Sequence, residues 1–127
     1  MSKQIINSKN APAPIGPYSQ AVKANGMLFV SGQVCINPSN GELINGNIID
    51  ETHQVMKNLK AILEEAGTDF SKVVKSSIFV KDLNNFMTIN GVYGEYFPSE
   101  TAPARETVEV SRLPKDVNVE ISCIALV

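Results

Sequence analysis

The clearest pattern of hydrophobic and polar positions lies in residues 50–66, DETHQVMKNLKAILEEA, where apolar side chains recur at helical spacing. We predict a helix here that is capped by Asp50 and terminated by Gly67, since a polar cap and a following glycine are typical helix boundaries. A second helix is predicted over 83–97, where one face is aromatic and aliphatic and Pro98 stops the pattern.

Apolar runs on either side of these helices predict strands. Residues 19–34, SQAVKANGMLFVSGQV, are typical of a hairpin, because Asn25-Gly26 suits a two-residue turn that needs a positive φ at both positions. Residues 36–47 are rich in Asn, Gly and Pro and predict a loop. Residues 72–81, KVVKSSIFVK, predict a single strand that separates the two helices.

The chain ends in a predicted strand pair, ETVEV (106–110) and VNVEISCIALV (117–127), joined by a polar turn over 112–116. The element order is two strands with a possible third, then helix, strand, helix and two strands, which favours an α+β fold: a mixed sheet with both helices on one face. The last strand begins with strict alternation and ends apolar on both sides. Two helices cover only one sheet face, so we expect the other face to pack against further subunits.

Arg105 and Glu120 raise the question of chemistry, because Arg105 lies in the extended run TAPARETVEV (101–110) that leads into the first of these strands, and Glu120 lies in the second. One interpretation is an exposed pair or a structural ion pair. The other is that Arg105 binds the carboxylate of a ligand, for which a guanidinium is well shaped, and that Glu120 acts as an acid or base beside it. In a paired hairpin, an odd sum of partner numbers places both side chains on one face and an even sum separates them. The sequence does not decide the register.

Three further positions have both a structural and a functional interpretation. Tyr18, placed at the start of the hairpin, is either a half-buried packing residue or the wall of a small pocket with its hydroxyl as a donor. Ser31-Gly32 interrupts a buried strand, which indicates either a simple bulge or the close approach of a ligand or backbone.

Composition narrows the function classes. The 127 residues are expected to form one domain, 1–127, with a net charge of −2 and a pI of about 5.4, and the lack of basic runs disfavours nucleic acid as a partner. Neither a membrane span nor a secretory signal is predicted. Cys35 and Cys123 lack the C-x-x-C spacing, which favours buried free thiols and a reducing compartment, the cytoplasm by default.

Several catalytic classes lose support from the residue inventory. His53 is the single histidine and falls in the first turn of the predicted helix, where we expect it to be solvated, so a Ser-His-Asp or Cys-His set is not predicted. The residues do not predict a metal site or a nucleotide-binding motif. Any catalysis is therefore expected to need no cofactor and to use Arg, Glu, Tyr and backbone groups.

Over essentially its whole length the chain resembles the Rid family of reactive-intermediate imine deaminases, also known as the YjgF or endoribonuclease L-PSP family. The resemblance lies in APAPIGPYSQAV, LFVSGQV, NLKAILEEAG, VYGEYF, PAR, LPKD and VEI, which occur here in this order. It implies a chorismate-mutase-like α+β fold and a homotrimer with a ligand cleft at each subunit interface. It also implies cofactor-free hydrolysis of 2-iminobutanoate and 2-iminopropanoate to 2-oxo acids and ammonia.

The same resemblance assigns roles residue by residue. Arg105 matches the arginine that binds the substrate carboxylate, Glu120 the carboxylate that positions or activates water, and Tyr18 the pocket tyrosine. The matched substrate contacts are Ser31, Gly32, Asn90 and Thr107; at position 107 one subgroup of the family has a cysteine in place of this threonine. The alternatives are a carboxylate-binding or chaperone-like trimer without catalysis and, less favoured by the acidic balance, an RNA-cleaving translation inhibitor.

Overall fold

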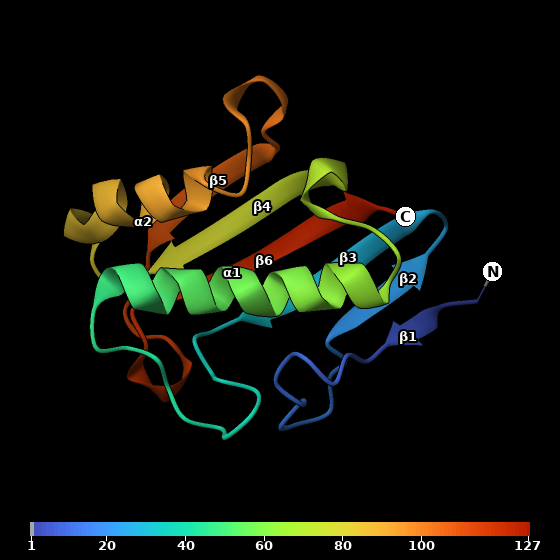
Figure 1. Ribbon diagram of the computed structural model, residues 1–127, viewed down its shortest axis with the longest axis horizontal. Helices are drawn as coiled ribbons and strands as arrows, with labels where there is room; N and C mark the ends of the chain where they lie inside the picture. Colours follow the sequence, from blue (N-terminus) through green and yellow to red (C-terminus); the bar gives the residue numbers. More distant parts are fainter. Residues whose placement is uncertain (1) are drawn as a thin grey trace.

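Six strands form one mixed sheet, and two α-helices cover one of its faces (Figure 1). The computed structural model describes residues 2–127. The strand order is β1-β2-β3-β6-β4-β5, in which β4 and β5 are parallel and all other neighbours antiparallel. This confirms the predicted α+β class with both helices on one face. The elements are β1 (Gln4–Ile6), β2 (Ala21–Ala24), β3 (Met27–Gln33), α1 (Ile48–Glu65), β4 (Val73–Val80), α2 (Phe86–Gly94), β5 (Ala104–Glu109) and β6 (Val119–Leu126).

Helix α1 begins two residues earlier than the sequence predicted. Asn47, not Asp50, is its cap: the Asn47 Oδ1 accepts a hydrogen bond of 2.8 Å from the Asp50 N–H, which satisfies one of the free donors of the first turn. The predicted terminator is confirmed, because Gly67 has a φ of +84°, a left-handed conformation that glycine adopts without strain.

Helix α2 is shorter than the predicted helix over 83–97. Residues Leu83–Asn85 form a separate 3-10 turn, capped by the Asp82 side chain, and regular helix covers only Phe86–Gly94. The hairpin turn at Asn25-Gly26 is confirmed, with φ values of 53° and 78°.

The predicted pairing of the two terminal strands is wrong. Strand β4 lies between β5 and β6, as Figure 1 shows, because α2 returns the chain to the sheet edge, where β5 pairs in parallel with β4. The polar segment 112–116 is therefore not a hairpin turn. It leads the chain back across β4 so that β6 inserts antiparallel between β3 and β4. Within it Lys115 and Asp116 both have a positive φ, of 57° and 56°.

The core lies between the sheet and the helices. The β6 side chains that face the helices are fully or almost fully buried, as the alternating pattern predicted. The two free cysteines, Cys35 and Cys123, are buried as expected, and burial raises the pKa of their thiols to about 11 and about 12.

The opposite face of the sheet, here called the open face, has no helix over it. A row of cross-strand partners, Ile5, Val22, Phe29 and Ile124, runs across it from the edge strand β1 to the central strand β6. Ile5 and Phe29 are about half exposed, at 51% and 47%. The open face is thus apolar and accessible in the single chain.

Candidate active site

Arg105 lies on the edge strand β5 and points toward the helices. Its cross-strand partner on β4 is Ser76, a buried residue of the helix-covered face, and partners across a sheet share a face. The Arg105 Nη1 donates a hydrogen bond of 2.8 Å to the Asn90 Oδ1. Its guanidinium carbon lies 5.0 Å from the ring centre of Tyr93 and 5.8 Å from that of Phe86.

The groups that hold Arg105 come from a single stripe of α2. Phe86, Asn90 and Tyr93 are spaced i, i+4 and i+7, so they share one face of the helix. All three are uncharged, and within residues 2–127 Arg105 forms no ion pair with a carboxylate. The guanidinium is therefore oriented by neutral groups, and its other N–H donors can bind an anion that does not belong to these groups.

The surroundings of Arg105 carry further polar groups. Thr107 lies two residues along β5 on the same face, opposite the buried Ile78, and its Oγ1 is buried without a hydrogen-bond partner among the described residues. The Ser76 Oγ and the Tyr93 OH are also buried without a hydrogen-bond partner among the described residues. Ser76 was not predicted as a neighbour of Arg105, and Phe86 and Tyr93 were expected only as part of the aromatic and aliphatic face of the helix over 83–97. The helical spacing of these two rings, which places them on the same helix face as Asn90, could have identified them as neighbours of the site.

Glu120 lies on the other side of the sheet from Arg105. Ser76 is the partner of both Arg105 and Cys123, so these two share the helix-covered face. Glu120 is three positions from Cys123 on the same strand and pairs with Phe79, which places it on the open face. The question that the sequence left open is thus decided: Arg105 and Glu120 lie on opposite faces, and the odd-or-even rule does not apply because β4 lies between their strands.

The Glu120 carboxyl packs against the backbone of Gly32. A Cβ placed on Gly32 would lie 2.8 Å from the Glu120 Cδ and closer still to its Oε2. The β3–β6 register also shifts between Val30 and Gln33, so Gly32 sits in a bulge. The bulge predicted at Ser31-Gly32 is therefore confirmed, and the group that approaches Gly32 closely is the Glu120 side chain, whereas the sequence suggested a ligand or backbone. Partial burial raises the pKa of the Glu120 carboxyl above its ordinary value.

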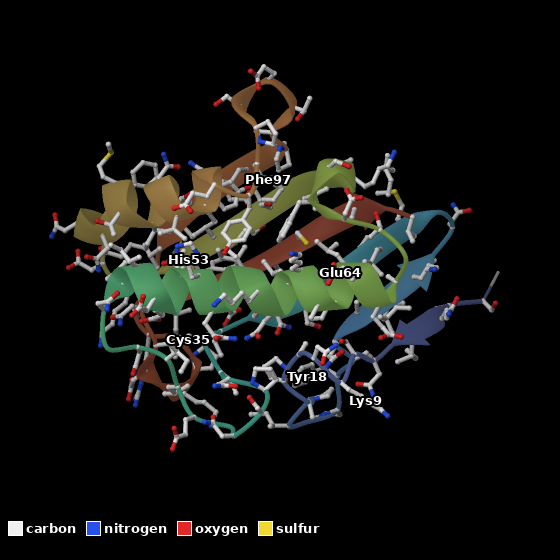
Figure 2. All side chains as sticks on the ribbon, viewed as in Figure 1. Lys9, Tyr18, Cys35, His53, Glu64 and Phe97 are labelled. Atoms are coloured by element: carbon white, nitrogen blue, oxygen red, sulfur yellow. The ribbon has the colours of Figure 1, made fainter. Side chains whose placement is uncertain are left out.

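Ser31 ties the segment that carries Tyr18 to this bulge. Its Oγ donates a hydrogen bond of 2.6 Å to the Ser19 carbonyl oxygen, and its N–H donates one of 2.9 Å to the Gln20 carbonyl oxygen. Tyr18 is half exposed and precedes β2 instead of starting it, which corrects the predicted position. Figure 2 shows Tyr18 in the N-terminal loop, on the other side of α1 from Phe97.

Tyr18 and Gly32 both line a small cavity at this end of the sheet. Its remaining walls are largely apolar and come from Pro12, Ile15 and Val34 among others. All seven predicted site residues therefore fall into two groups. Arg105, Asn90 and Thr107 form one half-site beneath α2, and Glu120, Gly32, Ser31 and Tyr18 form a second half-site at the β3 bulge.

His53 is partly buried and lies within hydrogen-bond distance of a tyrosine, whereas the sequence predicted a solvated side chain. Its Nδ1 lies 2.8 Å from the Tyr96 OH, and its ring is partly covered where α1 meets the end of α2. Across residues 2–127, no three His, Cys, Asp or Glu side chains are grouped so as to hold a metal ion. The same residues contain no helix long and apolar enough to cross a membrane.

Comparison with known proteins places the chain in a family. The sequence model of the family described as Endoribonuclease L-PSP matches residues 8–127. A RutC family protein of Pyrococcus horikoshii is 54% identical, over 97% of each chain. The chloroplastic Reactive Intermediate Deaminase A of Arabidopsis thaliana is 43% identical, over 98% of this chain and 66% of that protein.

Solved structures agree with this assignment. A Rid family protein of Yersinia pestis superposes with a TM-score of 0.96 at 50% identity, covering 99% of this chain and 100% of that one. TdcF of Escherichia coli, solved with bound serine, superposes with a TM-score of 0.91 at 41% identity, covering 98% of each chain. The chain belongs to the Rid family, the YjgF or endoribonuclease L-PSP family to which its sequence pointed.

Proposed function

We propose that this protein hydrolyses reactive 2-imino acids, of the size of 2-iminobutanoate and 2-iminopropanoate, to 2-oxo acids and ammonia without a cofactor. The observation that carries the proposal is the state of Arg105. It is a half-buried cation, oriented by an amide and two aromatic rings, that lacks an anionic partner among the described residues. Such a group fits the carboxylate that every 2-imino acid bears.

In this proposal the Arg105 half-site selects and orients the substrate. The guanidinium binds the carboxylate through paired N–H donors, Asn90 keeps the guanidinium in its plane, and the free Thr107 hydroxyl adds a hydrogen bond. Loss of a partly desolvated charge pair of this kind costs roughly 2–5 kcal/mol in binding. The Reactive Intermediate Deaminase A of Arabidopsis, a relative over nearly all of this chain, supports the reaction class.

The Glu120 half-site supplies the water. A carboxyl whose pKa is raised by burial can take a proton from water and return it, and positioned proton transfer is worth about 10²–10⁴-fold in rate. Water adds to the imine carbon while Glu120 takes one of its protons and passes it to the nitrogen, which gives a carbinolamine. The hydroxyl proton of the carbinolamine then passes to the nitrogen by the same route as the carbon–nitrogen bond breaks, which releases ammonia and a 2-oxo acid. Tyr18 and the Ser31-Gly32 bulge form the wall on this side.

The two half-sites require a second copy of the chain to act on one ligand. Arg105 and Glu120 lie on opposite faces of the sheet, so one chain does not present both to the same small molecule. The apolar row on the open face gives copies a surface on which to associate. We therefore propose a homotrimer with composite clefts, whose ligand is a small amino-acid-like carboxylate. The serine bound by the TdcF structure supports a ligand of this size.

The proposal is tested by the decay of the enamine and imine formed in situ by a threonine dehydratase. Wild-type protein is expected to hasten the decay, Arg105→Ala to lose the effect through a raised KM, and Glu120→Ala through a lowered kcat. If all three proteins match the protein-free reaction, the enzymatic proposal fails. The non-catalytic carboxylate-binding alternative then predicts saturable binding of 2-oxobutanoate to wild type and not to Arg105→Ala.

A further inference from the structure

Glu51, in the first turns of α1, is a fully buried carboxylate to which the proposed mechanism gives no role. Its Oε2 accepts hydrogen bonds from the backbone N–H groups of Asn118, at 2.7 Å, and Val119, at 3.1 Å. Its Oε1 accepts one from the Asn118 Nδ2, at 2.9 Å. All three of these hydrogen bonds come from N–H donors, and the buried Cys35 thiol also lies against the carboxyl, where Glu51 contributes to raising the pKa of that thiol.

These donors belong to the two residues that immediately precede Glu120. The chain reaches them through the segment in which Lys115 and Asp116 have positive φ values, a conformation that residues with a side chain avoid. Asn118 is held on its other side by a hydrogen bond of 3.0 Å from the Lys81 N–H to its carbonyl oxygen. Glu51 thus fixes the point where a strained turn enters β6.

We infer that Glu51 is a positioning residue for Glu120. The carboxylate holds the backbone of β6 from the helix side, one residue before the position from which Glu120 extends onto the open face. The Glu120 carboxyl has little freedom there, because it packs directly against Gly32. A shift of the strand start therefore moves the carboxyl relative to the substrate. This inference rests on the proposed function of Glu120.

The test compares steady-state kinetics of imine hydrolysis for Glu51→Ala, Glu51→Gln and Thr52→Val. Glu51→Ala leaves three donors unpaired and is expected to lower kcat about 10- to 100-fold, the effect of displacing a catalytic group by about 1 Å, with KM within about two-fold. In Glu51→Gln the remaining oxygen accepts the backbone N–H groups and the Asn118 amide rotates to accept from the new NH₂, so kcat stays within about three-fold. Thr52→Val is the matched control, because Thr52 is the neighbouring buried residue and its hydroxyl donates a hydrogen bond to the Ile48 carbonyl oxygen within α1.

A double-mutant cycle separates positioning from simple support of the fold. In a Glu120→Gln background, Glu51→Ala is expected to have no further effect on kcat, whereas independent effects that multiply would overturn the inference. If Glu51→Ala does not fold, Asn118→Ala, which removes only the side-chain donor, takes its place with a smaller loss of the same kind. An unchanged kcat in a folded Glu51→Ala protein would also overturn it.

One readout does not depend on turnover. The Glu120 carboxyl is titrated by NMR in each variant, and its pKa is expected to fall toward the ordinary value in Glu51→Ala, because the displaced carboxyl becomes more solvated, and to stay unchanged in Thr52→Val. If wild type lacks activity but this shift occurs, the proposed function fails and the positioning role stands. An unmoved titration in Glu51→Ala overturns the positioning role whatever the activity.

Discussion

The contact between Gly32 and Glu120 gives the sharpest prediction for single-residue replacement. In Gly32→Ala the new Cβ would lie 2.8 Å from the Glu120 Cδ and 3.0 Å from its Cγ, well inside the contact distance of about 3.5 Å between carbon atoms. The atoms that must yield are the far end of a flexible side chain, so the carboxyl moves by roughly 1 Å and the backbone stays in place. A displacement of that size at a catalytic group lowers kcat about 100-fold, while the free energy of unfolding changes by less than about 1 kcal/mol.

The assay for Gly32→Ala is imine hydrolysis together with urea denaturation. The matched control is Gly46→Ala, since a Cβ on Gly46 meets nothing within 4 Å and its φ is not in the left-handed region. The control is expected to keep wild-type kcat and KM. A Gly32→Ala protein with wild-type kcat would refute the role of the Glu120 carboxyl at this place. A crystal structure of the variant with Glu120 unmoved would refute the steric argument itself.

Three further predictions test other parts of the site. Inactive Arg105→Ala and Glu120→Ala chains, refolded together at equal amounts, are expected to regain activity in about a quarter of their clefts, because only a site made from two copies can combine the intact halves; no recovery would contradict a composite site. Burial raises the pKa of Glu120 in the folded protein above its ordinary value of 4.5. The free energy of unfolding therefore falls as the pH rises from 4.5 through the folded-state pKa, because the buried carboxyl must ionise. Glu120→Gln is thus expected to be more stable than wild type at pH 7 and equal to it below 4.5, by denaturation at each pH, and the opposite sign would refute burial as the main influence on the pKa of Glu120. Gly91→Ala, inside α2 with open space around its Cβ, is expected to raise the free energy of unfolding by about 0.5–1 kcal/mol in urea titrations; a fall would reveal a contact at that position.

Local signals predicted the local structure well. The hydrophobic period found α1, and its error at the start arose because Asn47 and Asp50 are both good caps and only the Asn47 side chain takes that role. The Asn25-Gly26 pair determined its turn by backbone sterics alone. Alternation in the last strand correctly separated the buried side chains from Glu120.

Pairing between distant segments was not predictable in the same way. The turn at 112–116 has the composition of a hairpin, yet β6 passes β5 and pairs with β3 and β4, because those neighbours let it bury its apolar side chains under α1. Because the pairing of the two terminal strands was predicted wrongly, the positions of Arg105 and Glu120 relative to each other could not be predicted either. Arg105 and Glu120 occupy opposite faces of a sheet in which β4 lies between their strands. The spacing of residues along the sequence does not reveal this strand order.

The place of β6 in the sheet has a consequence for how the chain folds. The last of the described strands along the chain is a central one in the sheet: β6 pairs with β3 on one side and β4 on the other, and its register with β3 runs as far as the Leu126–Met27 pair. Until β6 arrives, the β1-β2-β3 meander and the β4-α2-β5 unit share no strand pairing. Such long-range closure slows folding and leaves the edges of β3 and β4 unpaired meanwhile. The sheet is therefore completed only when β6 inserts, and loss of β6 would remove the pairing that joins its two parts.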